Sequence, residues 1–314
     1  MRILVVMDPV STVNVDEDTS FSIMLEAENR GHRVDHCAAQ DLVLVGSDVS
    51  ARVRRATCSR ETDPPIALGD PEDVRLADVD VVFMRKDPPF DDDYMWASLL
   101  LEHTRGGPLL VNDPRGLRDA NEKLYATYFP ELMPETVVTS HADRIKAFVK
   151  SVGGRGVIKP LSGKGGESIF ALSLDDPNLN AILETVTHEG RQLVMVQRFL
   201  PEVAVGDKRI LLLEGEFLGV ILRVPQGGDL RSNIHVGGRV AGTELDDDDR
   251  RIIEAVAPRL RADGLAFVGL DVIGGKLTEV NVTSPTGIQQ ASRLSGQNLE
   301  AKVIEWLETK RAST

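Results

Sequence analysis

Short apolar runs in the first third of the chain constrain its fold more than any other feature. Residues 3–7, 79–84 and 109–111 read ILVVM, VDVVFM and LLV, with a single polar residue among them. Strands that are apolar on both faces must be buried on both, which is typical of parallel sheets. Apolar residues at helical spacing in 21–27 and 95–103 complete the order of βαβ units. We therefore predict an α/β domain with a doubly wound parallel sheet, which would bind ligands at the carboxyl ends of its strands.

The rest of the chain is predicted to form two further α/β units. A helix is expected from residue 113 to about 129, and an antiparallel strand pair around a glycine turn follows. Residues 46–73 lack a clear period, although 51–58 is compatible with an edge strand that carries exposed arginines, and 225–239 reads as a polar loop. The other predicted elements are strands 136–139, 157–160, 169–172, 193–199, 209–213, 217–224, 267–273 and 276–282, and helices 142–152, 179–187, 246–262 and 299–309.

Length, charge and cysteine content narrow the class of protein. A chain of 314 residues exceeds one ordinary core, and its net charge of −13 argues against nucleic-acid binding. Two cysteines, Cys37 and Cys58, without CxxC spacing exclude a disulfide scaffold and a cysteine-rich zinc site. The first residues read as a strand and not as a signal peptide, and no run approaches the roughly 20 apolar residues of a membrane span. We expect a cytoplasmic protein without nucleic-acid or membrane partners.

A glycine cluster after a predicted strand is a candidate phosphate-binding turn. Gly163, Gly165 and Gly166 surround Lys164, but the P-loop pattern GxxxxGK[ST] is absent. A dinucleotide-binding turn must open a helix, whereas residues 169–172 are strand-like. The cluster is therefore interpreted as a hairpin tip that forms a glycine lid over a nucleotide, and the alternative is a plain surface turn.

Two lysines support a phosphate site near this turn. Lys159 lies in the apolar strand that leads to the glycines, where a lysine is costly to bury unless an anion pairs with it. Phosphate oxygens would supply that partner, and Lys123 could reach the same phosphates from the other side. The alternative for each is an ordinary solvated lysine.

The hairpin of residues 267–282 is the strongest constellation. Asp271, Glu279 and Asn281 are polar residues within apolar strands, and oxygen ligands of this kind suit Mg²⁺ held together with phosphates. A two-residue loop at Gly274-Gly275 would place Asp271 opposite Thr278, leaving the two carboxylates on opposite faces. We predict a three-residue loop with a bulge at the glycines, which pairs Asp271 with Glu279. The alternative is a sheet with one solvated polar face.

Arginines recur at positions where anionic substrates could bind. Arginine grips carboxylate or phosphate groups with two parallel hydrogen bonds, and in an acidic chain such positions indicate anionic substrates, although each could also be an ordinary surface arginine. The histidines show no metal-binding spacing, and His235 lies in the polar loop. The candidate arginines are Arg85, Arg209, Arg223, Arg231 and Arg239.

These residues fall in stretches by which the chain resembles the bacterial glutathione synthetases of the ATP-grasp superfamily over nearly its full length. The stretches around Arg85 and Asn281 are far more specific than a glycine turn. They include VVMDPV, SFSIMLEAENRGH, MRKDPPFD, VNDPRGLRDANEKL, IKPLSGKGGESIF, DKRILLL, RVPQGGDLRSN and GLAFVGLDVIGGKLTEVNVTSPTGI.

The resemblance implies an N-terminal α/β substrate-binding domain at 1–122, a central ATP-grasp lobe with the glycine lid at 123–200, and a C-terminal lobe with the Mg²⁺ site at 201–314. Lys164, in the glycine lid, and His235, in the polar loop, depart from the family pattern. The implied roles are ATP binding by Lys123, Lys159, Gly163, Gly165, Gly166, Gln197, Leu200 and Asn281, metal binding by Asp271, Glu279 and Asn281, catalysis by Arg209, and substrate binding by Arg85, Arg223, Arg231, Arg239 and Ser284.

The implied reaction joins γ-glutamylcysteine to glycine through an acyl phosphate. ATP is the co-substrate, Mg²⁺ is the cofactor with Mn²⁺ as the alternative, and a homo-oligomer, a dimer or tetramer, is expected. Without the resemblance, the residues alone predict an ATP- and Mg²⁺-dependent phosphoryl-transfer site with anionic substrates. The alternatives are an ATP-grasp ligase with a different acid or amine, and a nucleotide-binding protein or oxidoreductase without ligase activity.

Overall fold

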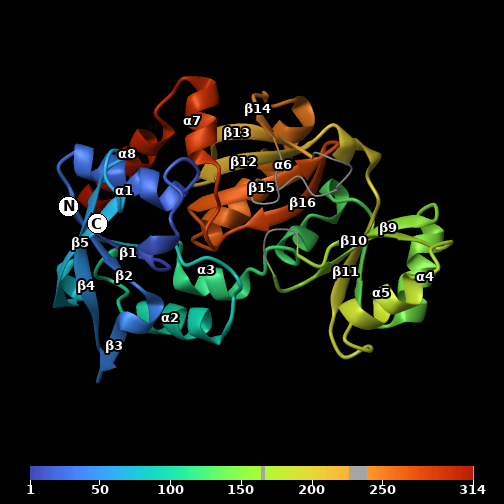
Figure 1. Ribbon diagram of the computed structural model, residues 1–314, viewed down its shortest axis with the longest axis horizontal. Helices are drawn as coiled ribbons and strands as arrows, with labels where there is room; N and C mark the ends of the chain where they lie inside the picture. The colour runs from blue at the N-terminus through green and yellow to red at the C-terminus, as the bar shows by residue number, and fades with distance from the viewer. Residues whose placement is uncertain (164–166, 226–238, 314) are drawn as a thin grey trace.

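The computed structural model describes residues 1–163, 167–225 and 239–313, which form three sheets (Figure 1). In the first sheet four strands are parallel, in the spatial order β2-β1-β6-β7. Antiparallel strands extend it beyond β2. The strands are β1 (Arg2–Val6), β2 (Arg33–Cys37), β3 (Leu42–Val45), β4 (Asp48–Cys58), β5 (Ile66–Arg75), β6 (Val81–Met84) and β7 (Leu109–Val111).

Helices cover both faces of the parallel strands. Ile3 and Val5 of β1 pack with α1 (Thr19–Asn29) on one face, whereas Leu4 and Val6 pack with α2 (Asp92–Glu102) and α3 (Pro114–Asp119) on the other. Aspartates cap all three helices: the Asp18, Asp91 and Asp113 side chains accept backbone N–H groups of the first turn. The prediction of a doubly wound α/β domain is confirmed.

Two predictions for the first half of the chain are wrong. Strand β4 is not an edge strand, because it pairs with β2, β3 and β5. The helix expected to reach residue 129 ends at Asp119, because Ala120 is extended and the Asn121 carboxamide oxygen accepts the N–H groups of Lys123 and Leu124. Asparagine thus starts a separate turn that leads into a short 3₁₀ helix.

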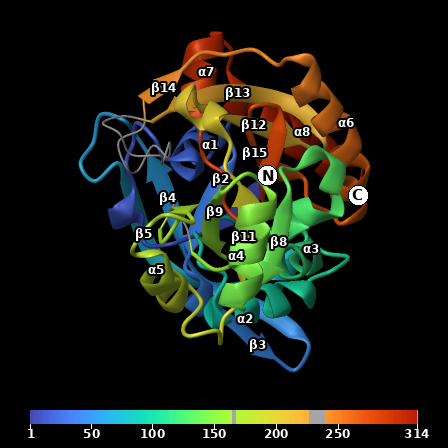
Figure 2. The ribbon, with the colours of Figure 1, turned by 90° about the vertical axis from the view of Figure 1, so that its right-hand side faces the viewer.

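The second sheet has the order β10-β9-β11-β8 and is covered on one face by two helices. Turned by 90°, this unit stands in front of the other two sheets (Figure 2). Its small core, which includes Ile145, Ile158 and Leu183, is separate from the rest of the hydrophobic core. The elements are β8 (Thr136–Thr139), β9 (Arg155–Pro160), β10 (Phe170–Ser173), β11 (Val194–Arg198), α4 (Ala142–Ser151) and α5 (Leu179–Val186).

The third sheet has the order β14-β13-β12-β15-β16 and carries helix α6 on one face and α7 and α8 on the other. Helix α7 and strand β14 were not predicted. The elements are β12 (Asp207–Leu213), β13 (Glu216–Val224), β14 (Arg239–Ala241), α6 (Asp247–Ala262), β15 (Phe267–Ile273), β16 (Lys276–Asn281), α7 (Ile288–Ser295) and α8 (Leu299–Ala312). The 3₁₀ helices are η1 (Val10–Thr12), η2 (Ala39–Asp41), η3 (Leu76–Asp78), η4 (Tyr125–Tyr128), η5 (Pro130–Leu132) and η6 (Pro201–Ala204).

Buried hydrogen bonds join the first and third sheets. Asn112, just after β7, donates to the carbonyl oxygens of Phe267 and Val282 at 2.9 and 2.7 Å, and its own carboxamide oxygen accepts the Phe267 N–H at 2.8 Å. The metal-site hairpin predicted from sequence is therefore fixed against the parallel sheet. Among the described residues, no helix is both long enough and apolar enough to cross a membrane.

Candidate active site

A polar face on the third sheet collects four of the predicted site residues. Arg209 of β12 lies opposite Asp271 of β15, which in turn lies opposite Glu279 of β16. Directly opposed residues of antiparallel strands share a face, and Asn281 follows Glu279 by two positions. The register therefore places Arg209, Asp271, Glu279 and Asn281 on one face, as the sequence predicts.

The pairing of Asp271 with Glu279 is confirmed, but the predicted loop is wrong. The turn is the two-residue form, since Ile273 pairs with Lys276 across the glycines. The extra residue is Thr278, which bulges from β16 and donates its hydroxyl to the Asp271 carbonyl oxygen at 3.1 Å. Residues two apart on a regular strand point to the same face, yet Leu277 lies in the core and Glu279 on the polar face. The bulge at Thr278 therefore reverses which face the following side chains point to.

Asp271 is the centre of a buried ion cluster. Arg209 donates its Nε to Asp271 Oδ1 at 2.5 Å and its Nη2 to Oδ2 at 3.0 Å. Arg223 Nη2 lies 3.0 Å from Asp271 Oδ1 and 2.6 Å from Asp207 Oδ2. Burial alone would raise the pKa of Asp271, but Arg209 and Arg223 hold that pKa well below its usual range.

Glu279 meets the second sheet. Lys159 of β9 is 8% exposed and places its Nζ 3.4 Å from Glu279 Oε1. Burial raises the pKa of Glu279, yet the positive charges of Lys123 and Lys159 lower it overall. Lys123 is also buried. The two predicted phosphate-binding lysines thus converge on the carboxylate predicted to bind metal.

Other predicted nucleotide contacts lie on the second sheet or just beyond it. Gln197 of β11 pairs with Val157, next to Lys159, and donates its Nε2 to Thr136 Oγ1 at 3.2 Å. Leu200 is buried after β11, and Gly163 has a φ of 113°, with no atom within 4 Å of where a Cβ would stand. Predictions that lie outside the described residues are Lys164, Gly165, Gly166, Arg231 and His235.

Arg85 and Ser284 form a second group, between the first and third sheets. Arg85 is 3% exposed, donates its Nε to Ser20 Oγ at 3.0 Å, and donates its Nη2 to the Pro285 carbonyl oxygen at 3.1 Å. Its Nη1 has no hydrogen-bond partner in the described part of the chain. Ser284 donates its hydroxyl to Asp87 Oδ1 at 2.7 Å. Burial lowers the pKa of Arg85, against the attraction of nearby acids.

The segment after β16 links this second group to the ion cluster. Arg85 holds the carbonyl oxygen of Pro285, and Arg209 Nη1 donates to that of Thr286 at 3.3 Å. Among the candidate arginines that the structure describes, Arg239 differs from the others because its side chain is exposed. Its neighbour Val240 lies opposite Arg223. Arg239 therefore points away from the face that carries Arg209.

The residues of this face could hold a hard cation such as Mg²⁺ only if a substrate supplied the remaining oxygen ligands. No group of three or more histidine, cysteine, aspartate or glutamate residues that could hold a metal occurs in residues 1–163, 167–225 and 239–313. Asp271 and Glu279 supply two carboxylates, and the Asn281 amide donates its Nδ2 to the Gly269 carbonyl oxygen at 3.3 Å, which keeps Oδ1 as a ligand atom. Mg²⁺ typically binds one or two carboxylates plus phosphate oxygens, which matches this set.

Two further acids of the site, the buried Asp207 and the half-buried Glu122, were not predicted. Asp207 pairs with Arg223, and its position two residues before Arg209 in an apolar strand was an available signal. Glu122 accepts the Thr283 hydroxyl at 2.7 Å, and burial raises its pKa. Nothing in the sequence separates Glu122 from an ordinary helix-surface glutamate.

Comparison with family models assigns both halves of the chain. Residues 1–118 match the model for the N-terminal domain of prokaryotic glutathione synthetase, and residues 122–296 match the model for its ATP-grasp domain. Two similar curated proteins are the glutathione synthetases of Gloeobacter violaceus and Shewanella oneidensis. The first is 47% identical over 98% of this chain and 96% of its own length, and the second is 42% identical over 99% of each.

Solved structures share the architecture at low sequence identity. A D-cycloserine synthetase superposes with a TM-score of 0.66 at 14% identity and covers 97% of this chain and 99% of its own. The D-alanine–D-alanine ligase of Bacillus anthracis superposes with a TM-score of 0.61 at 17% identity, over 100% and 99%. At such identity the comparison shows the fold, and the fold prediction is confirmed.

Proposed function

The chain belongs to the prokaryotic glutathione synthetase family, and from this premise we propose that it is an ATP-dependent carboxylate–amine ligase. In the proposed reaction γ-glutamylcysteine is joined to glycine, and ATP is converted to ADP and phosphate. One observation carries the proposal: Asp271 and Glu279 lie side by side, between Arg209 on one sheet and Lys159 on another.

ATP is proposed to bind between the second and third sheets. Lys123 and Lys159 would pair with its phosphates, which explains two buried lysines that share one carboxylate. Gln197, Leu200 and Gly163 would contact the nucleotide from the second sheet, together with Gly165, Gly166 and Asn281.

The proposed cofactor is Mg²⁺, with Mn²⁺ as the alternative, held by Asp271, Glu279 and Asn281. Such an ion neutralises charge on the phosphates during transfer. A solved ATP-grasp ligase of similar fold was obtained with Mg and ADP. Because Asp271 is already bound by two arginines, Glu279 is the carboxylate with more freedom to take a new ligand.

The chain's own residues would act by position and charge. The dipeptide carboxylate attacks the γ-phosphate to give an acyl phosphate, the glycine amine attacks its carbonyl carbon, and phosphate leaves. Arg209, oriented by both Asp271 oxygens, would stabilise the charge that develops on the transferred group. No enzyme nucleophile is needed in this scheme.

The dipeptide is proposed to bind through cationic and hydroxyl groups. Arg85, Arg223 and Ser284 would contact it, and this role is supported by Arg85 Nη1, which has no hydrogen-bond partner among the described residues. Arg231 and Arg239 remain predictions, and Arg239 would have to reach the site from the opposite face of β14.

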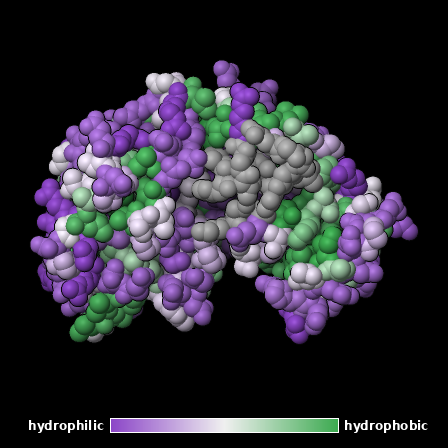
Figure 3. Space-filling view, viewed as in Figure 1, coloured by the Kyte–Doolittle hydropathy of each residue, from purple (hydrophilic) through white to green (hydrophobic). Residues whose placement is uncertain are grey.

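Three broader features belong to the same proposal. The domain limits are proposed at 1–122, 123–200 and 201–314, and the protein is placed in the cytoplasm, where its two buried thiols would stay reduced. A homo-oligomer is supported by apolar side chains on end strand β3 and on α2, visible as a patch at the lower left of Figure 3. Its exposed residues are Val43, Leu44, Val45, Trp96 and Leu99.

An ADP-release assay tests the activity. The protein is mixed with ATP, Mg²⁺, γ-glutamylcysteine and glycine, and each substrate is omitted in turn. ADP release should require both the dipeptide and glycine. ADP release that is the same with and without glycine would overturn the proposal, and release that depends on a different acid or amine would replace it with another ligase.

A further inference from the structure

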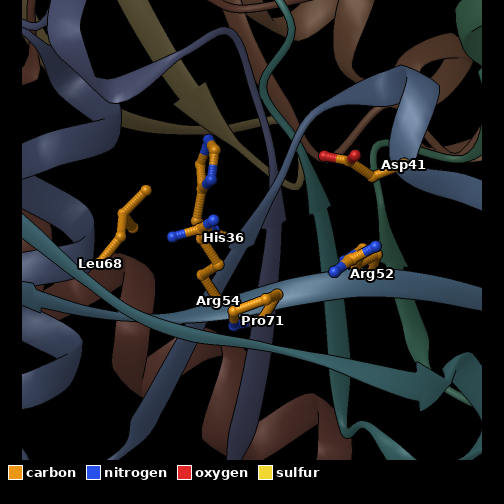
Figure 4. Close-up of a pocket in the computed structure, with 6 residues that line it drawn as sticks. All are labelled: His36, Asp41, Arg52, Arg54, Leu68 and Pro71. Atoms are coloured by element: carbon orange, nitrogen blue, oxygen red, sulfur yellow. The ribbon is translucent and has the colours of Figure 1, made fainter.

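A cavity of about 230 Å³ lies at the carboxyl end of β2, away from the ion cluster on the third sheet. It is lined by His36, Asp41, Arg52, Arg54, Leu68 and Pro71. In Figure 4 the Arg54 side chain rises beside His36, Arg52 and Asp41 lie to one side, and Leu68 lies to the other. Three of the six lining side chains are therefore basic.

Strand register explains why the basic side chains meet. His36 of β2 lies directly opposite Arg54 of β4, so both project from the same face of the sheet. Arg52 precedes Arg54 by two positions and shares that face. His36 is 7% exposed and its Nε2 lies 3.4 Å from the Asp8 carbonyl oxygen, which fixes the ring at the inner end of the cavity.

The two arginine side chains of this cavity are exposed to solvent. Among the described residues neither Arg52 nor Arg54 forms an ion pair, although Asp73 lies opposite Arg52 in the register. Arg54 makes one long bond, to the Gly69 carbonyl oxygen at 3.4 Å. Asp41 is the acid of the lining, and its Oδ2 accepts the Ala38 N–H at 2.8 Å.

On the other face of the same strands, arginines and carboxylates form ion pairs. There Asp35 accepts Arg2 at 2.6 Å and Arg33 at 3.1 Å, and Glu72 also pairs with both arginines. On the cavity face, Arg52 and Arg54 form no ion pair with any described residue, although the chain has a net charge of −13, and they stand beside a buried histidine. Such a constellation fits an anion with two or more charges.

We propose that the cavity lined by His36, Arg52 and Arg54 is a binding site for a small polyvalent anion, recognised through a phosphate or carboxylate group. Its volume is below the roughly 300–1,000 Å³ of pockets that enclose drug-sized ligands, which favours a small ion over a nucleotide. Burial lowers the pKa of His36, and a bound anion would favour its protonated form.

Titration calorimetry on the full chain tests the site. Inorganic phosphate and citrate are titrated separately at constant ionic strength, set with chloride. The variant R52Q/R54Q should bind at least about tenfold more weakly, because charge-assisted hydrogen bonds to the anion are lost. Arg55→Gln is the matched control, since Arg55 is exposed on the same strand but opposite Asp35 on the other face, and it should bind as the wild type does.

Each outcome decides the proposal. Binding that is lost in R52Q/R54Q supports the proposal. If phosphate alone binds, the site is specific for phosphate; if citrate alone binds, it is a polycarboxylate site; if both bind, it is a general anion site. Phosphate bound at the proposed ATP site would instead persist in R52Q/R54Q and be lost in Lys159→Met, so the two sites are distinguishable. Binding that R52Q/R54Q leaves unchanged, or no binding of either anion, would overturn the proposal. Circular dichroism confirms that the variants are folded.

Discussion

Asp271 and Glu279 are neighbours across one strand pair, yet their surroundings give them different roles. Asp271 is bound by two arginines that are themselves buried, so its charge is part of the folded structure. In the part of the chain that the structure describes, Glu279 forms a single ion pair, with Lys159 at 3.4 Å. We expect substitution of the first to affect mainly stability and of the second mainly catalysis.

Asp271→Asn should lower the free energy of unfolding by about 3–5 kcal/mol, because it leaves Arg209 and Arg223 buried, with Asp207 as the one remaining carboxylate partner among the described residues. Urea unfolding followed by circular dichroism measures the change. A variant as stable as the wild type would show that water or another group compensates the arginines.

Glu279→Gln should remain folded with a small change in stability, while ADP release falls about 100-fold or more, because a ligand of the proposed metal site loses its charge. Raising the Mg²⁺ concentration should restore part of the activity. Turnover like that of the wild type would remove Glu279 from the metal site.

The stability contributed by Asp271 should depend on pH in a defined direction. Its pKa is lowered in the folded state, whereas in the unfolded chain it is about 3.9. As pH falls toward and below that value the unfolded chain takes up the proton first, so the contribution is present above about pH 4 and is lost in acid. The difference in unfolding free energy between wild type and Asp271→Asn should therefore shrink from pH 7 to pH 3, and a constant difference would contradict the ion-pair account.

At the scale of elements, periodic segments were predicted correctly and local exceptions were not. Three of the four parallel strands, β1, β6 and β7, and helix α6 follow from apolar runs and acidic caps, which are properties of the segment itself. The fourth, β2, has the sequence RVDHC and was not predicted. The Thr278 bulge, the Asn121 turn and β5 depend on side-chain hydrogen bonds or on a partner strand. Strand β5 contains Gly69 and Pro71, so its sequence alone does not indicate a strand. It is stabilised by pairing with β4.

The same limit applies to the site. Arg209, Asp271 and Glu279 were found because polar residues in apolar strands need a reason to be there. Glu122 was missed because its burial arises from contacts between distant segments, such as the bond from Thr283.

Helix α3 shows how one element can fix the arrangement of sheets. Gly116 faces the end of α6, where an added Cβ would lie 2.1 Å from the Asp263 carbonyl oxygen. Gly116→Ala should therefore force α3 away and cost about 1–3 kcal/mol, even though alanine is the better helix former. Thermal unfolding measures the loss, and Asp119→Ala, an exposed position on the same helix, is the control and should have little effect.

At the scale of the whole molecule, the N-terminal sheet is closed by the C-terminal end of the chain. Helix α8 packs against α1, so that Ile304 and Leu307 share a core with Phe21 and Met24 (Figure 1). Around this contact Arg30 pairs with Glu305 at 3.2 Å and with Glu308 at 2.7 Å. The same core reaches Leu211 of β12, whereas the core of the second sheet is separate.

This division of the core predicts which parts of the molecule unfold together. Ile304→Ala should cost about 2–5 kcal/mol, and hydrogen exchange followed by mass spectrometry should show the loss of protection in β1 and β12 together. Protection in α4 should change far less, because its apolar residues pack only within the second unit. Lys302→Ala, at an exposed position of α8, is the control. Loss of protection confined to α8 would mean that the helix is an appendage, and that the N-terminal sheet is stable without the chain's last segment.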